Sequence, residues 1–171
     1  PVTPLRRLTA VPYGSASPLV VDAGRMKGYT AVNYPGDFAH LEEIDLRSGS
    51  RRRLAVIDGP MMYQTAYVAF DRRRRRLFWT DRNNGIRGIR WMTLSQDRHR
   101  RDAASDTTAA GLKVPASGHL TFQRTSNIVY DNARDMLYGL MSHEGVTHLV
   151  RYDAALSRQD VLYTFPFGVS V

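Results

Sequence analysis

Three copies of one short pattern constrain the fold of this chain more than any other feature. In each copy a short apolar run ends in an Asp, a polar turn follows, and a second apolar run begins. The three residues are Asp22, Asp71 and Asp131, so the copies lie 49 and 60 residues apart. A carboxylate at a strand end can accept hydrogen bonds from the N–H groups of the turn, and we expect that structural role for all three. The pattern predicts successive small antiparallel sheets.

Apolar runs and turn residues around each Asp are spaced closely enough for about four strands per copy. The predicted strands are residues 18–22, 29–34, 40–46 and 53–58, then 65–71, 77–81 and 86–94, then 127–131, 136–141, 146–152 and 160–165. Repeats of about 40–50 residues with several strands each are typical of β-propellers. We therefore predict an all-β domain over residues 1–171, with propeller blades at approximately 17–60, 63–115 and 118–171.

The sequence also predicts bulges, a tight turn and additional short strands. The alternation of polar and apolar residues breaks at Glu42-Glu43 and again at Gly88, and a β-bulge at each would repair it. Asn84-Gly85 predicts a tight hairpin turn. Residues 8–13 and 118–123 are candidates for extra strands, and residues 111–115 are the candidate for the fourth strand of the second copy.

Three blades do not close a ring, because propellers have typically four to eight. The chain also begins with Pro1 instead of Met. We expect it to be part of a larger ring, completed by further blades of the same polypeptide or by a partner protein; an open sandwich is the alternative.

The second copy resembles a known repeat. Asp71, a basic turn and then Leu77-Phe78-Trp79-Thr80-Asp81 resemble the Tyr-Trp-Thr-Asp repeat of LDL-receptor-type propellers, with Phe78 in place of Tyr. The other copies keep only the frame, which is also similar to TolB-like and NHL-like repeats. The resemblance implies a β-propeller that serves as a binding platform, without specifying its ligand.

Composition narrows the function classes. Cysteine is absent, which excludes disulfides and thiolate metal sites, and no apolar run approaches the ~20 residues of a membrane-spanning helix. A periplasmic or extracellular location is expected over a cytoplasmic one. The net charge of +8 comes almost entirely from Arg. It could attract nucleic acid, anionic lipid or an acidic partner, although a GC-rich genome would also favour Arg.

The Arg run marks the candidate interaction surface. Arg side chains could hold phosphates, and nearby aromatic rings could stack on bases. The alternative is a solvated turn with strand aromatics packed between blades. The predicted surface comprises Arg72, Arg73, Arg74, Arg75, Trp79 and Trp91.

Two acidic and histidine clusters could suggest metal chemistry, but neither has the required pattern. His143 and His148 are five residues apart, whereas the helical zinc-protease motif needs four, and the intervening Gly145 indicates a hairpin tip. Asp37, His40 and the Glu42-Glu43 pair lack the spacing of a calcium loop. We therefore predict no metal ligands, cofactor or catalytic residues.

The sequence favours a non-catalytic propeller module for protein–protein interaction or assembly. The first alternative is a metal-dependent hydrolase or lactonase with its site in the central channel of a propeller. The second is nucleic-acid binding through the Arg-rich face, with a steep dependence on salt.

Overall fold

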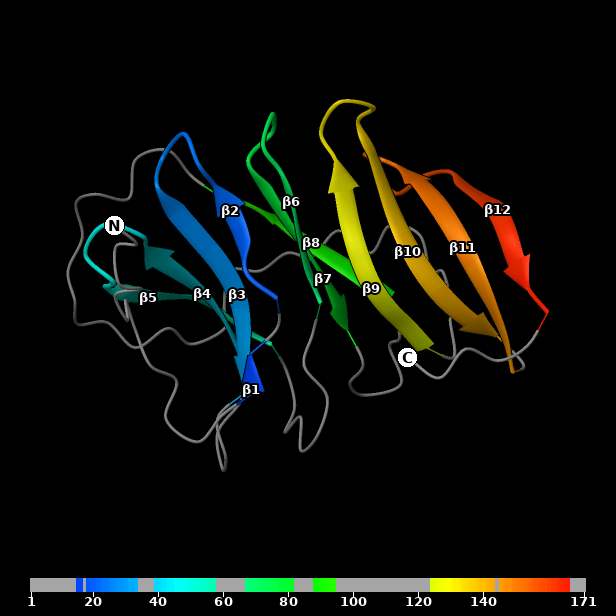
Figure 1. Cartoon of the computed structure of the whole chain (residues 1–171), viewed down its shortest axis with the longest axis horizontal. Helices are drawn as coiled ribbons and strands as arrows, with labels where there is room; N and C mark the ends of the chain where they lie inside the picture. The colour runs from blue at the N-terminus through cyan, green and yellow to red at the C-terminus, as the bar shows by residue number, and fades with distance from the viewer. Residues whose placement is uncertain are drawn as a thin grey trace, which may run out of the picture. The chain divides into compact units, whose positions relative to one another are not determined.

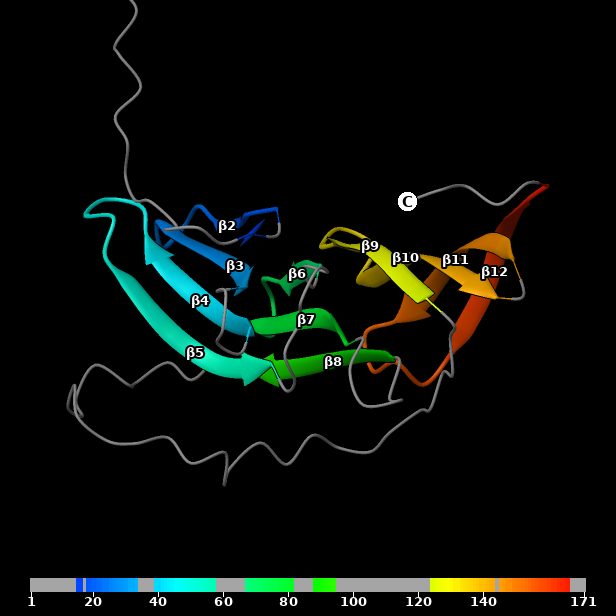
Figure 2. The same cartoon turned by 90° about the horizontal axis from the view of Figure 1, so that it is seen from below.

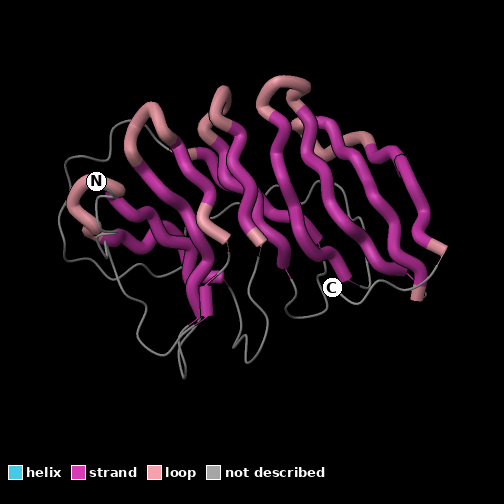
Figure 3. Tube along the Cα trace, viewed as in Figure 1, coloured by secondary structure: helices cyan, strands magenta, loops and turns pink. Residues whose placement is uncertain are grey.

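The computed structural model describes residues 15–16, 18–33, 39–57, 67–81, 88–94, 124–143 and 145–166. Within these ranges every regular element is a strand, and the strands form three antiparallel sheets (Figures 1 and 3). The expected all-β fold is therefore confirmed. The chain divides into two compact units, residues 1–68 and 69–171.

The first sheet contains β1 (Ser15–Ala16), β2 (Val20–Asp22), β3 (Lys27–Asn33), β4 (Ala39–Asp45) and β5 (Arg51–Ile57). β4 separates β3 from β5, while β1 and β2 both pair with the other edge of β3. The predicted bulge lies between Leu41 and Glu42, where the extra residue is Leu54 on β5. β4 is largely buried on both faces, so its side chains do not need to alternate strictly.

The second sheet contains β6 (Val68–Asp71), β7 (Arg76–Asp81) and β8 (Gly88–Thr93) in that order. The bulge predicted at Gly88 is wrong, because β7 and β8 pair without a shift and Gly88 lies opposite Asp81. Strict alternation is not required here, because the side chains at 89–92 are half-buried on both faces of β8. On the neighbouring β7, Leu77, Phe78, Trp79 and Thr80 are all 0–2% exposed. The Asn84-Gly85 turn and the candidate strands at 8–13, 111–115 and 118–123 lie outside the described residues.

The third sheet contains β9 (Arg124–Asp131), β10 (Met136–His143), β11 (Val146–Asp153) and β12 (Gln159–Phe165), which lie side by side in chain order (Figure 1). β9 bulges at Asn127, whose φ is +47°, and β12 bulges at Leu162. Pairing between β10 and β11 continues to His143 and Val146, so these two strands form the predicted hairpin.

The two faces of the third sheet follow from this register. We call them the packed face and the open face. The packed face carries Ile128, Tyr130, Leu137, Gly139, Val150 and Tyr152, all of them buried. The open face carries Val129, Tyr138, Leu140, Leu149, Tyr163 and Phe165, of which Val129 and Tyr163 are exposed.

The same turn follows β2, β6 and β9. Each has four residues between the Asp that ends one strand and the first residue of the next, at positions 23–26, 72–75 and 132–135. The fourth residue has a positive φ in every copy: 52° at Met26, 54° at Arg75 and 59° at Asp135. Glycine is absent from all three positions, although a left-handed conformation costs other residues roughly 1–2 kcal/mol. A shared strained conformation at one place in each copy shows that the repeat is structural.

Within the second unit, the second and third sheets pack against each other (Figure 2). The Phe78 ring of β7 stacks on the Tyr130 ring of β9, with centroids 5.4 Å apart and planes inclined by 10°. Offset stacking adds about 0.5–1.5 kcal/mol to the burial of the two rings.

Candidate functional site

In two of the three repeats, the carboxylate of the Asp that precedes the turn accepts main-chain N–H groups of that turn, as expected. The Oδ1 atom of Asp71 accepts the N–H of Arg74 at 2.9 Å. Asp131 accepts the N–H groups of Ala133 at 2.9 Å and Arg134 at 3.1 Å. Asp22 is buried and binds its turn through its main-chain carbonyl, which accepts the Arg25 N–H at 3.2 Å, so the expected role of its carboxylate stays a prediction. These bonds satisfy turn N–H groups that have no strand partner.

An Arg lies three residues after each of these Asp residues, and in the second unit it binds that Asp. Nη1 of Arg74 is 3.2 Å from Oδ2 of Asp71, and Nη1 of Arg134 is 2.8 Å from Oδ2 of Asp131. The bond from the Arg134 side chain is the main cause that lowers the pKa of Asp131.

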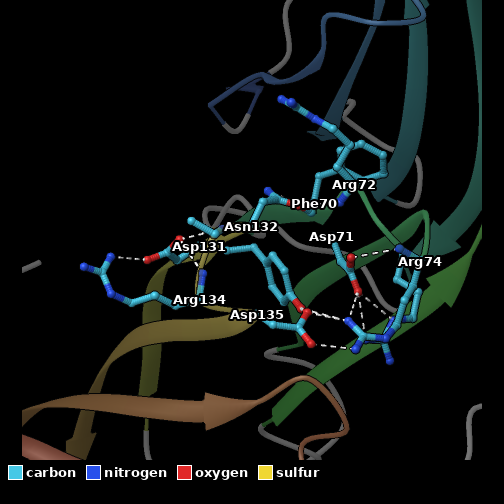
Figure 4. A network of polar contacts seen from close by, with 11 residues as sticks. Phe70, Asp71, Arg72, Arg74, Asp131, Asn132, Arg134 and Asp135 are labelled. Carbon is cyan, nitrogen blue, oxygen red and sulfur yellow. Dashed lines mark hydrogen bonds and ion pairs between the residues drawn. The ribbon is translucent and has the colours of Figure 1, made fainter.

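Arg74 also crosses from the second sheet to the third (Figure 4). Its Nη2 donates to Oδ2 of Asp135 at 2.6 Å, and its Nη1 donates to Oδ1 of the same carboxylate. The Tyr130 hydroxyl donates to Asp135 at 2.6 Å. We call Asp71, Arg74, Tyr130, Asn132 and Asp135 the turn clasp. The clasp joins the turn after β6 to the turn after β9.

Asn132 supplies the amide part of the clasp. Its side-chain oxygen accepts the main-chain N–H of Arg72 at 2.7 Å, and its Nδ2 donates to the carbonyl of Phe70 at 3.2 Å. One side-chain amide thus pairs with both main-chain groups at the end of β6, much as a neighbouring strand would. Figure 4 shows this bridge beside the Asp71 turn.

Electrostatics favour the ionised forms of Asp71 and Asp135 and the neutral form of Tyr130 in the clasp. The Arg74 bond, followed by the Tyr130 hydroxyl, lowers the pKa of Asp135 well below its usual range. Burial is the largest cause that raises the pKa of Tyr130, and its bond to Asp135 raises it further. Burial alone would raise the pKa of Asp71, but hydrogen bonds from Arg74 and Arg76 outweigh it and lower that pKa.

The candidate interaction surface is only partly present in the structure. Arg72 and Arg73 are exposed, but Trp79 is 2% exposed and cannot belong to a surface. Arg74 is held by the clasp. Trp91 is half-buried and, together with Phe78, flanks the guanidinium of Arg76 at 5.3 and 5.4 Å. Arg75 is half-buried.

Arg76 completes the buried charge arrangement beneath the turn. Its Nη2 is 2.8 Å from Oδ2 of Asp71, and the Asp71 side chain has no exposed surface. The alternative to a phosphate-binding run was a solvated basic turn with packed strand aromatics, and the exposed Arg72 and Arg73 fit that alternative. Arg74 and Arg76 differ from it, because they pair with carboxylates. The aromatic rings proposed for base stacking are likewise internal, because Phe70, Phe78 and Trp79 are buried.

A cavity of about 460 Å³ lies beside the clasp in the second unit. Its walls are Arg74, Arg76, Arg134, Asp135, Met136, Asp153, Ala154 and Ala155. Asp153 is engaged by its own turn, accepting the Ser157 N–H at 2.7 Å and the Arg158 N–H at 3.0 Å. The three Arg side chains on the wall each have an ion-pair partner: Arg74 binds Asp135, Arg76 binds Asp71 and Arg134 binds Asp131.

The two histidine and acidic clusters do not converge. Nδ1 of His148 is 3.0 Å from the Thr164 hydroxyl, while His143 lies on the neighbouring strand. Nε of Arg51 donates to Glu42 at 2.8 Å, and Nη2 of Arg52 is 3.2 Å from Glu43. Asp37 lies outside the described residues. Within the ranges that the structure describes, no three His, Asp or Glu residues are grouped as metal ligands.

Exposed apolar side chains gather on the third sheet. Val129 is 62% exposed on β9, and Val161, Leu162 and Tyr163 are 54%, 45% and 54% exposed on β12. These residues were not predictable from the sequence, because single exposed apolar residues are normal and only the register shows that they share a sheet. Tyr130, Asn132 and Asp135 were not predicted either, although an alignment of the three turns at their Asp residues would have shown their positions. No helix among the described residues is long and apolar enough to cross a membrane.

Comparison with known proteins supports the fold and leaves the family open. No protein-family profile matches the chain, and no curated protein does. Among solved structures, 23 chains match. One comes from a crystal structure of a nidogen/laminin complex, with a TM-score of 0.68 and 15% identity over 95% of this chain. The present chain spans 53% of that protein chain, about half of its length. The matched chain is a β-propeller of the Tyr-Trp-Thr-Asp type, which confirms the propeller fold expected from residues 71–81.

Proposed function

We propose that this chain is a non-catalytic part of a β-propeller that serves in protein–protein interaction or assembly. The observation that carries the proposal is the open face of the third sheet, where Val129 and Tyr163 are 62% and 54% exposed. Clustered apolar exposure is characteristic of protein contact surfaces. The solved structure that resembles this chain is itself a complex of two proteins, nidogen and laminin, which supports the same class of function.

The charges support this proposal more than the alternatives. A propeller hydrolase needs acidic or His side chains that converge on a reactive centre, whereas Glu42, Asp71 and Asp135, in the part of the chain that the structure describes, are each paired with Arg. A nucleic-acid surface needs Arg side chains directed at solvent; Arg72 and Arg73 are exposed, but Arg74 and Arg76 bind carboxylates, which leaves only part of the Arg run for such a surface. The blade boundaries at 17–60, 63–115 and 118–171 and an extracytoplasmic location remain predictions.

The test is affinity capture with the immobilised chain from extracts of its source organism. We expect at least one protein to be retained by the unmodified chain and lost with the double variant Val129→Glu/Tyr163→Glu. Val21→Glu is the matched control, because Val21 is an exposed valine on β2, 43% exposed. It should retain the same protein. Retention that does not depend on Val129 and Tyr163 would refute the proposal.

Two measurements on the same preparations separate the alternatives. Stoichiometric metal in the purified chain, with hydrolytic activity that depends on it, would favour the enzyme. Binding of generic nucleic acid that weakens steeply as salt rises would favour the Arg-rich surface, since each phosphate contact releases counterions.

A further inference from the structure

The open face of the third sheet can be compared, position by position, with the face of the second sheet that contacts the third. Counted from the turn Asp, Phe78 and Tyr138 are both at the seventh following position, and Arg74 and Arg134 are both at the third. Ala69 and Val129 both lie two residues before the Asp. The face of the second sheet that carries Phe78 is covered by the third sheet. The equivalent face of the third sheet is the open face.

Burial at equivalent positions shows the difference directly. Ala69 is 2% exposed and Phe78 is 0% exposed, whereas Val129 is 62% exposed and Tyr138 is half-buried. Arg74 has 38% of its side chain exposed and binds Asp135, whereas Arg134 is 74% exposed. The open face therefore has the composition of an internal contact but the exposure of a surface.

We infer that the open face docks a further blade through the same code that joins the second sheet to the third. This inference rests on the proposed function and specifies its partner. The docked blade presents an aromatic ring one residue before its turn Asp, which stacks on Tyr138 as Tyr130 stacks on Phe78. It presents a carboxylate at the fourth turn position, which binds Arg134 as Asp135 binds Arg74.

A side-chain amide completes the code. In the turn clasp, Asn132 pairs with the carbonyl before Asp71 and the N–H after it. The equivalent main-chain groups on the third sheet are the carbonyl of Tyr130 and the N–H of Asn132. The partner is therefore an antiparallel blade with the order aromatic, Asp, Asn, two residues of any kind, and Asp or Glu. The solved propeller chain that this chain matches is nearly twice as long, so a neighbouring blade fits the architecture.

Charge complementarity selects this partner over a merely apolar one. Arg134 brings a positive charge to the edge of the open face, and Asp131 already engages one of its nitrogens. Arg74 has the same bond to its own Asp and still binds Asp135 with two nitrogens. A guanidinium has five N–H donors, so both partners can be satisfied at once. A blade with Lys or Arg at the fourth turn position would place like charges together.

The experiment supplies such a blade in cis. Residues 118–171 are repeated after Val171, so that an added third sheet follows the original one. Twelve residues, 166–171 and then 118–123, would connect β12 to the added copy of β9, and the chain connects β5 to β6 with ten. A connection of that length reaches about 40 Å, whereas three strand spacings are only about 14 Å.

The readout is the reactivity of one thiol. The chain has no cysteine, so Val129→Cys in the original sheet gives a unique thiol on the open face. We expect the rate at which a thiol reagent modifies this Cys to be at least about tenfold lower in the extended chain than in the 171-residue chain, because a docked blade covers it. Val21→Cys, on exposed β2, is the control and should react equally in both chains.

Charge reversal tests the code itself. Asp135→Arg in the added copy alone should restore fast modification, and Arg134→Asp in the original sheet should then slow it again. Rates within about twofold of the 171-residue chain, or an added sheet that stays unfolded by amide exchange, would overturn the inference. Equal protection before and after charge reversal would also overturn it, because apolar contact alone would then be sufficient. Since the extended chain contains only this sequence, the result does not depend on whether affinity capture finds a partner.

Discussion

The buried carboxylate of Asp71 offers the sharpest test of how the second unit is held together. Asp71→Asn preserves the side-chain shape and keeps an oxygen that can accept the Arg74 N–H, seen at 2.9 Å. It removes the negative charge that Arg76 contacts at 2.8 Å. Arg76 is 9% exposed, so the substitution leaves a buried cation without its partner.

The magnitude follows from that burial. Removing one partner of a buried ion pair costs about 3–5 kcal/mol. The lower end, about 3 kcal/mol, applies here because Arg76 keeps its contacts with the rings of Phe78 and Trp91. For a domain of this size, that loss lowers Tm by about 6–12 °C.

Urea unfolding gives the free energy directly. With an m-value of about 2 kcal/mol/M, the midpoint should fall by about 1.5 M at unchanged slope. Asp131→Asn is the matched control, because the Asp131 carboxylate also accepts turn N–H groups and pairs with the Arg three residues on, but that partner, Arg134, is 74% exposed. It should cause a much smaller shift. Equal shifts for the two variants would refute the argument, since burial is what distinguishes them.

A second variant tests the cause of the loss. In Asp71→Asn/Arg76→Met, the unpaired cation is replaced by an apolar side chain that can pack against Phe78 and Trp91. Replacing a buried ion pair with apolar residues is often neutral, so the double variant should recover much of the stability lost by Asp71→Asn. No recovery would mean that the turn, and not the buried charge, determines the effect.

Two further predictions follow from the repeated turns and their carboxylates. Met26 has a φ of 52°, a conformation that Asn tolerates and β-branched residues do not. In urea unfolding, the Met26→Asn chain should therefore be at least about 1 kcal/mol more stable than the Met26→Ile chain. Equal stabilities would contradict the turn conformation. The pKa values of Asp71, Asp131, Asp135 and Asp160 are all lowered in the folded chain. The unfolded chain therefore binds more protons, so stability should be full above the unfolded Asp pKa of about 3.9 and fall as acidification passes below it. The fall should be smaller in Asp71→Asn, and thermal unfolding across pH values would show whether it is.

The strand frame was predictable because it depends on local signals. Each copy has an apolar run that ends in Asp, a four-residue turn and a second strand. In the third copy, β9 ends at Asp131 and β10 begins at Met136, as expected. The bulge at Gly88 was predicted wrongly because alternation indicates register only when one face is exposed, and the side chains at 89–92 are half-buried on both faces of β8.

The clasp was not predictable from local signals. The Arg run suggests a solvated or phosphate-binding turn, and only the packing of two sheets brings Arg74 to Asp135, 61 residues away. Trp79 was assigned to a surface, although packing of the strand aromatics was the stated alternative. It is 2% exposed, because the side chains on both faces of β7 are buried.

Contact between the rings of Phe78 and Tyr130 tests the central claim most directly, because it requires two separate sheets to stack face to face. With centroids 5.4 Å apart, protons of the two rings should give clear cross-peaks in a nuclear Overhauser spectrum of the specifically labelled chain. The same peaks should vanish on unfolding in urea. A folded chain that shows no cross-peak between these rings would contradict the stacked arrangement, and with it both the clasp and the docking code.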